Sequence, residues 1–229
     1  PESKNDHEVH TYSGFTLCYR ESYELAEWVS YELTREELNT VTGRTNDFRA
    51  DALITTQSAS PADYKKSGYD RGHLAPAADM EWSVQSASES FLMSNMTPQA
   101  PSLNRGLWKT LEEQVRSWAD FFGAVTVVTG PVLEKPASEY NGIGENDVKV
   151  PEYFYKALLT LLPTENGNYA AVGIAFILPN KKCEGTIYDY EVTIDELEER
   201  TGIDFFALLP DSMEDDIEKS LQTSIWKSK

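Results

Sequence analysis

The chain has 229 residues, of which 40% are hydrophobic and 25% are charged, and its formal net charge is −18. This composition excludes a mostly disordered chain, a collagen-like repeat and a coiled coil, and no apolar run approaches the ~20 residues that span a bilayer. The acidity argues against a nucleic-acid partner, because phosphate binding is driven by Lys and Arg. Residues 61–120 are nearly neutral, however, with six basic and eight acidic side chains.

The N-terminal part of the chain predicts an arm followed by short elements. Residues 1–14 are polar and aperiodic, and we expect a flexible arm there, followed by a single domain over residues 15–229. The elements expected next are strands at 15–19 and 26–33, a helical turn at 34–38, a loop at 39–52, a short strand at 53–56, a turn or short helix at 61–69, a short helix at 86–93 and a loop at 98–102.

The clearest helix is expected at residues 103–122. Apolar side chains recur there at spacings of four, four, four, three and four, which form one stripe on a helix. They are Leu103, Leu107, Leu111, Val115, Trp118 and Phe122. Gly123 is a suitable residue to end this helix.

The remaining elements complete a mixed pattern. The expected elements are a buried strand at 124–129, a polar loop at 134–149, and strands at 153–162 and 169–178 with a hairpin turn at Asn166-Gly167. Thr193 and Glu196 fit a capping box for a helix that ends at Gly202, and Asp211 and Glu214 fit a second box for a C-terminal helix. Strands and helices alternate without a βαβ rhythm, so the predicted fold class is α+β.

Two cysteines, Cys18 and Cys183, leave two possibilities open: a disulfide or two separate thiols. The sequence contains no CxxC and no Cys/His cluster typical of a metal site. The chain begins at Pro1 without Met and no signal peptide is visible. We expect an exported protein, secreted or periplasmic, whose signal segment is absent from this sequence.

The strongest chemical signal surrounds His73, the one histidine outside the N-terminal polar segment. Asp70, Arg71 and Gly72 precede it directly. A neutral imidazole can take a proton from water near pH 7, Arg71 can neutralise phosphate oxygens, and Gly72 permits close approach of the backbone to a ligand. This set suits phosphate-ester chemistry; the alternative is a charged turn with an incidental histidine.

A second group lies on the expected helix, on the side away from its apolar stripe. It comprises Asn104, Arg105, Lys109, Glu112 and Arg116. The Asn104 amide oxygen is a hard ligand suited to Mg²⁺. On one continuous helix, Asn104 and Glu112 would lie ~12 Å apart along the axis, so Glu112 would reach the same ion only through a water. The alternative for Glu112 and Arg116 is an ordinary surface pair.

Together these motifs resemble the DNA/RNA non-specific endonuclease family of the ββα-metal superfamily. The resemblance covers about residues 15–210. It rests on the segments 70–80, 95–99, 103–112, 129–131, 150–156 and 201–206. It implies a central antiparallel sheet with helices on its faces and a site built on a hairpin and a helix, the ββα-metal unit.

The resemblance also implies residue roles. His73 would be the general base, Asn104 the only direct protein ligand of Mg²⁺ (with Mn²⁺ as an alternative), and Glu112 the group that orients a metal-bound water. Arg71 and Arg116 would stabilise the charged transition state.

Two further roles follow from the same resemblance: Asn95 would support the site and Asp70 would orient a neighbouring group.

The implied substrates are DNA and RNA, contacted through their backbones and cut to 5′-phosphate ends. We expect a basic cleft made of Arg71, Arg105, Lys109 and Arg116, with the acidic residues elsewhere, in a monomer or homodimer. The alternatives are an inactive nucleic-acid-binding member of the fold and a phosphodiesterase that acts on small nucleotides.

Overall fold

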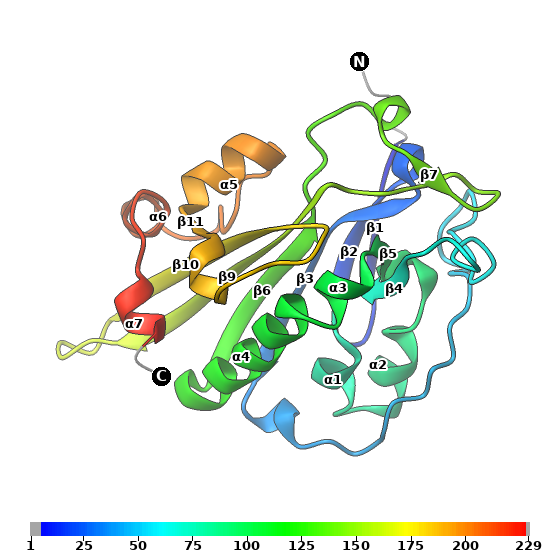
Figure 1. Cartoon of the computed structure of the whole chain (residues 1–229). Coiled ribbons are helices and arrows are strands. Elements are labelled where there is room, and N and C mark those ends of the chain that lie inside the picture. Colours follow the sequence, from blue (N-terminus) through cyan, green and yellow to red (C-terminus); the bar gives the residue numbers. More distant parts are fainter. Residues whose placement is uncertain (1–5, 228–229) are drawn as a thin grey trace.

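A large antiparallel sheet forms the centre of the computed structural model, which describes residues 6–227 (Figure 1). Within those residues the sheet has seven strands in the order β1-β2-β3-β6-β9-β10-β11. Their bounds are β1 His7–Thr11, β2 Thr16–Arg20, β3 Leu25–Thr34, β6 Ala124–Pro131, β9 Tyr153–Pro163, β10 Tyr169–Pro179 and β11 Glu191–Val192. The predicted α+β class with a central antiparallel sheet is thereby confirmed.

The sheet begins where a flexible arm is expected. Strand β1 pairs along its length with β2, so the expectation of an arm over residues 1–14 is wrong for His7–Thr11, whereas residues 1–5 lie outside the described part of the chain. The physical reason is that an edge strand is held by backbone hydrogen bonds, which polar side chains permit as readily as apolar ones.

Helices cover both faces of the sheet. On one face, α4 (Leu107–Phe122) packs Trp108 against Phe154 of β9 and Trp118 against Phe176 of β10. On the other face, α5 (Ile194–Thr201) and α6 (Asp211–Glu218) lie beside β10 (Figure 1), where Leu197 and Ile217 join a second apolar cluster. Both faces of β9 are therefore buried.

Capping and turn signals set several boundaries. The β9–β10 hairpin forms as expected, with Gly167 at φ +81° in its turn. Thr193 caps α5 by accepting a hydrogen bond from the Glu196 N–H, and the helix ends at Gly202 in a left-handed conformation, as expected. Asp211 is not a cap, because it lies inside α6, and a separate α7 (Thr223–Lys227) follows.

A smaller unit carries the chemically suggestive motifs. Strand β4 (Asp70–His73) pairs with β5 (Met96–Gln99), and the short helix α3 (Pro101–Asn104) leads from them into α4. The expected loop at 98–102 is therefore wrong: it holds the end of β5 and the start of α3. Two strands followed by a helix form the ββα unit.

The other elements are short. The helices are α1 Ala77–Met80 and α2 Val84–Glu89; the 3-10 turns are η1 Glu21–Tyr23, η2 Glu36–Leu38, η3 Met93–Asn95, η4 Ala137–Glu139 and η5 Ile187–Tyr190; and the strands β7 Gly142–Ile143 and β8 Val148–Lys149 form a small ladder. No strand forms at 53–56, because Leu53 N–H donates to the Asp51 carboxylate and closes a local turn.

Two expectations about the whole chain are also answered. Both cysteines are free thiols; Cys18 is buried and Cys183 is half-buried. Among the described helices, none is long and apolar enough to cross a membrane.

Candidate active site

One cleft of about 420 Å³ brings the two predicted residue groups together. Its lining comes from the loop after β3, from β4, from α1 and its preceding Pro76, and from α3 and α4. The lining residues are Arg44, Arg71, His73, Pro76, Ala77, Ala78, Asn104, Arg105, Lys109, Glu112 and Arg116. All four residues expected to make a basic cleft lie on it, together with Arg44, which sequence reasoning missed.

His73 ends strand β4 and lies in an aromatic environment. Its ring centroid is 5.0 Å from that of Phe91 and 5.7 Å from that of Phe48, and its Nε2 has no hydrogen-bond partner among the described residues. Burial and the nearby charges of Arg44 and Arg71 lower the pKa of His73 to about 3. The imidazole is therefore neutral at physiological pH and can accept a proton.

Asp70, at the start of β4, holds the Asn104 amide in place. The Asn104 Nδ2 donates to Asp70 Oδ2 at 3.0 Å, and Arg105 donates to both oxygens of the same carboxylate, at 2.6 and 2.7 Å. These bonds hold the pKa of Asp70 below its usual range. The Asn104 side chain donates through Nδ2, so its Oδ1 remains available as a ligand atom. Within residues 6–227 this oxygen accepts no hydrogen bond.

The helix that carries this group is broken rather than continuous. Asn104 ends α3, and Gly106 lies in the break before α4, where an added Cβ would come within 2.4 Å of the Ser102 carbonyl oxygen. The ~12 Å separation expected for Asn104 and Glu112 assumed one straight helix. Asn104 instead ends α3 and Glu112 lies in α4, on the other side of the break.

Two arginines are held by aromatic rings rather than by carboxylates. The Arg71 guanidinium lies 3.9 Å above the Phe48 ring, and that of Arg44 lies 5.1 Å from the Phe91 ring. Arg44 and Phe48 both come from the segment 39–52, which was expected only to be a loop. The segment is aperiodic and contains two arginines and one phenylalanine, so no sequence signal could have identified Arg44 and Phe48 as cleft residues.

The other cations of the cleft have acidic partners. Arg116 forms an ion pair at 2.8 Å with Asp79. The Asp79 side chain is fully buried and also accepts a hydrogen bond from the Tyr31 hydroxyl. Lys109 lies 3.5 Å from Glu113, an exposed i, i+4 pair that contributes little. Arg116 is thus anchored in the protein while its side chain remains partly exposed to the cleft.

Glu112 lies on α4 at the base of the cleft. Burial raises the pKa of its carboxyl, and the positive charges of Lys156 and Arg116 limit the rise. The Glu112 carboxylate and the Asn104 amide oxygen are both hard donors. Mg²⁺ commonly binds one or two such protein groups and keeps several waters, so this donor set fits the ion.

Asn95 does not line the cleft. It is fully buried; its Oδ1 accepts from the Ala75 N–H, and its Nδ2 donates to the carbonyls of Ala75 and Ser90. Its side-chain hydrogen bonds all go to backbone groups, which belong to Ala75, two residues after His73, and to Ser90. The expectation that Asn95 supports the site fits this geometry.

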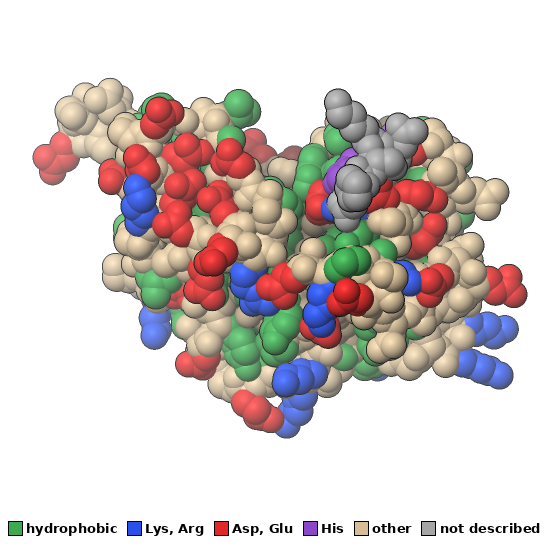
Figure 2. All heavy atoms as spheres, turned by 90° about the horizontal axis from the view of Figure 1, so that it is seen from above, with side chains coloured by type: hydrophobic (Ala, Val, Ile, Leu, Met, Phe, Trp, Pro, Cys, Tyr) green, Lys and Arg blue, Asp and Glu red, His purple; other side chains and the backbone are tan. Residues whose placement is uncertain are grey.

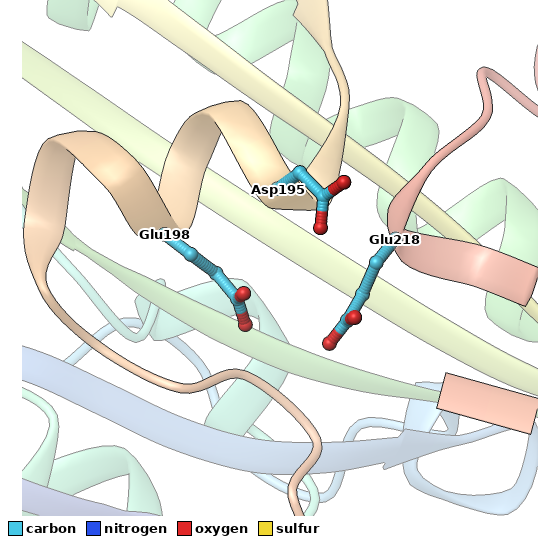
Figure 3. Close-up of side chains that lie close together, drawn as sticks. All are labelled: Asp195, Glu198 and Glu218. Atoms are coloured by element: carbon cyan, nitrogen blue, oxygen red, sulfur yellow. The ribbon is translucent and has the colours of Figure 1, made fainter. Parts of the chain in front are cut away.

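Much of the negative charge lies away from the cleft. Acidic side chains gather over α5 and α6 (Figure 2), and Asp195, Glu198 and Glu218 approach one another there (Figure 3). Burial and repulsion from neighbouring carboxylates raise the pKa of Glu218 to about 7. The net charge of −18 is thus unevenly distributed, and a locally basic cleft coexists with it.

The fold and the cleft are those of a ββα-metal hydrolase, and comparisons with known proteins identify the family. The family model for DNA/RNA non-specific endonucleases matches residues 2–212. The chain belongs to this family, whose members are metal-dependent nucleases.

Several relatives are similar over most of the chain. Over 222 residues it is 33% identical to the mitochondrial nuclease of Saccharomyces cerevisiae, covering 90% of this chain and 68% of that protein. Over 202 residues it is 34% identical to human mitochondrial endonuclease G, covering 83% and 67%. The crystal structure of an EndoG/EndoGI complex superposes with a TM-score of 0.80 at 28% identity, covering 90% of this chain and 88% of that chain.

These relatives overturn one expectation. The yeast and human proteins, and a zebrafish EXOG nuclease of which this chain spans 60%, are mitochondrial. The expectation of a secreted or periplasmic protein is therefore wrong, and the relatives point to the mitochondrion instead.

Proposed function

We propose that the chain is a Mg²⁺-dependent endonuclease without sequence preference, which hydrolyses phosphodiester bonds of DNA and RNA and leaves 5′-phosphate ends. One observation carries the proposal: His73 and Asn104 line the same cleft as a row of arginines. The cleft offers cations and an amide for phosphate and metal. Contacts to phosphates alone fix position on a nucleic acid without selecting its sequence.

In this mechanism His73 is the general base that activates water. Its low pKa ensures the neutral form, and that pKa is depressed partly by Arg44 and Arg71. An incoming phosphodiester would bring a negative charge that offsets both guanidinium groups, so the imidazole would become more basic once substrate is bound. Arg71, stacked on Phe48, would neutralise phosphate oxygens, and Arg116, which also lines the cleft, would add a second positive charge.

Asn104, through Oδ1, and Glu112, through a water, would hold the Mg²⁺ ion, which Mn²⁺ could replace. When bound, the ion supplies Lewis-acid stabilisation of the charge that develops on the phosphate. Asp70 positions the Asn104 amide, and Arg105 in turn holds Asp70.

The decisive experiment compares the parent protein with His73→Ala on plasmid DNA and on RNA, in Mg²⁺ and in EDTA. His10→Ala is the matched control, because His10 lies in edge strand β1. We expect the parent and the control to cut both substrates only with metal, and His73→Ala to be slower by about 10²–10⁴-fold.

Other outcomes would contradict the proposal. Equal rates for His73→Ala and the parent would remove His73 as the base. Binding of DNA without any cleavage would indicate an inactive member of the fold, and hydrolysis of small phosphodiesters alone would indicate a nucleotide phosphodiesterase.

A further inference from the structure

The side chain of Asn180 joins three separate segments of the chain through backbone contacts. Asn180 directly follows β10, and its Oδ1 accepts a hydrogen bond from the Ala100 N–H at 2.7 Å. Its Nδ2 donates to the carbonyl oxygens of Pro98 and Pro151, at 3.0 and 2.9 Å. The amide oxygen and both N–H donors are thus engaged, so this side chain ties the three segments together.

The central sheet fixes the position of Asn180 itself. Its backbone N–H donates to the Glu152 carbonyl at 2.8 Å, and Pro151 and Glu152 directly precede β9. Strands β9 and β10 pair along their whole length, up to the pair of Tyr153 and Pro179. The Asn180 amide is therefore attached to the end of a long ladder.

The other two contacts lie in the connection between β5 and α3. Pro98 belongs to β5, and Ala100 is the N-cap residue of α3, where it offers no polar side chain to cap the helix. Pro98 and Pro101 carry no N–H, so this connection has few backbone donors that could hold it in place. The Asn180 amide binds one of those donors, the Ala100 N–H, and also the Pro98 carbonyl.

Ala100 links these contacts to Asn104, which lines the cleft. The Asn104 N–H donates to the Ala100 carbonyl at 3.0 Å and closes the short helix α3. The Asn104 side chain is held separately, because its Nδ2 donates to Asp70 Oδ2 at 3.0 Å. With the backbone and Nδ2 both held, the direction of Oδ1 is fixed as well.

We propose that Asn180 is a positioning residue of the nuclease site: it fixes the start of α3 and thereby orients Asn104 Oδ1 toward a metal ion in the cleft. The consequence for metal binding rests on the proposed function, whereas the ordering of α3 does not and can be measured without metal or substrate. Without the Asn180 amide, Asn104 would have its ligating orientation in only a fraction of the molecules. The apparent metal affinity would fall by that fraction, and saturating metal would restore the active form.

The test uses variants that separate hydrogen bonding from volume and from general stability. Asn180→Ala removes all three side-chain bonds, whereas Asn180→Asp keeps the shape but sets an oxygen against the carbonyls of Pro98 and Pro151. Asn146→Ala is the matched control, because Asn146 Nδ2 also ties distant segments together, through a 2.9 Å bond to Asp63 outside the ββα unit.

The first readout is amide hydrogen exchange of the metal-free protein in EDTA, followed by NMR. We expect the Ala100 and Asn104 amides to be protected in the parent. Their protection should fall by about tenfold or more in both Asn180 variants, because a lost hydrogen bond lets α3 open locally. Asn146→Ala should leave it within about twofold of the parent.

The second readout is metal binding, measured by calorimetry with Mn²⁺ and by the Mg²⁺ dependence of DNA cleavage. Both Asn180 variants should bind Mn²⁺ about tenfold more weakly. They should need about tenfold more Mg²⁺ for half-maximal cleavage, with kcat at saturating Mg²⁺ within about twofold of the parent. Asn104→Ala identifies the part of the Mn²⁺ signal that belongs to the cleft, and Asn146→Ala should match the parent.

Several outcomes would overturn the inference. Unprotected Ala100 and Asn104 amides in the parent, or unchanged protection in Asn180→Ala, would show that Asn180 does not order α3. Parent-like behaviour of Asn180→Asp would mean that the side chain only fills space, and equal effects of Asn180→Ala and Asn146→Ala would mean that it acts only through general stability. If Asn180→Ala does not fold, Asn180→Ser replaces it in the same comparison.

Failure of the proposed function would look different. Loss of α3 protection in the Asn180 variants, together with parent-like Mn²⁺ binding by Asn104→Ala, would uphold the ordering of α3 and refute Asn104 as a metal ligand. If Asn104→Ala weakens Mn²⁺ binding and the Asn180 variants do not, Asn180 has no positioning role.

Discussion

The pH dependence of folding offers a direct test of the environment of His73. The imidazole is buried between two aromatic rings and two arginines, so its pKa in the folded protein is about 3, whereas in the unfolded chain it is about 6.5. The folded-state pKa is depressed, so between pH 6.5 and pH 3 the unfolded state binds a proton at His73 that the folded state does not bind. His73 therefore contributes stability above pH 6.5 that is lost as the pH falls from 6.5 toward 3.

The size of the effect follows from proton linkage. One proton bound only by the unfolded state costs about 1.4 kcal/mol per pH unit. Between pH 7 and pH 5 the loss assigned to His73 is then about 2 kcal/mol. The measurement is the free energy of urea unfolding at both pH values in EDTA, for the parent and for His73→Gln, which cannot titrate.

We expect the parent to lose about 2 kcal/mol more than His73→Gln over this interval. Comparing the two losses removes any constant cost of the substitution and the contribution of the many carboxylates. Equal losses in the two proteins would refute the reasoning, because His73 would then titrate alike when folded and unfolded.

Three further substitutions should act at named contacts. Gly72→Ala would place a Cβ 2.3 Å from the buried Gln99 side chain, and we expect a loss of about 1–3 kcal/mol in urea unfolding. Arg116→Met would leave the buried Asp79 carboxylate without its cation and should cost about 3–5 kcal/mol. Thr193→Ala removes the α5 cap and should lower stability by about 1 kcal/mol, with kcat for DNA cleavage unchanged.

Each of these has its own control. Gly43→Ala, at a position with nothing within 4 Å of an added Cβ, should be tolerated; a similar loss there and at Gly72 would contradict the packing argument. Adding Asp79→Asn to the Arg116→Met variant should recover part of the lost stability. If it recovers none, the unpaired Asp79 charge is not the cause of the loss. A drop in kcat for Thr193→Ala would show that α5 influences the cleft.

Local sequence signals predicted the elements that depend on neighbouring residues. The β9–β10 hairpin and the α5 caps at Thr193 and Gly202 follow from turn and capping chemistry within a few residues. Strand β5 was missed because it pairs with the distant β4. Strand β1 was missed although it pairs with the neighbouring β2, because its residues are mostly polar and show no apolar pattern. Pro98 also concealed β5, although its position opposite Arg71 in a two-stranded ladder accommodates it.

The site was predicted in part for the same reason. His73, Asn104 and Glu112 stand in motifs whose chemistry can be recognised along the chain. Arg44 and Phe48 come from an aperiodic loop, and only folding brings them to the cleft. Asn95 was expected to support the site from its place in a motif, and its side-chain hydrogen bonds all go to the backbone.

By itself the sequence determined which groups are available: one histidine just after an aspartate, an arginine and a glycine, and an amide and a carboxylate on an expected helix. Residue types and short-range periodicity are properties of the chain, so these features could be recognised without a structure. The tertiary structure alone decided the pKa of His73 and the ion pair between Arg116 and Asp79. Those properties depend on burial and on charges brought close from distant segments, and no local pattern encodes such distances.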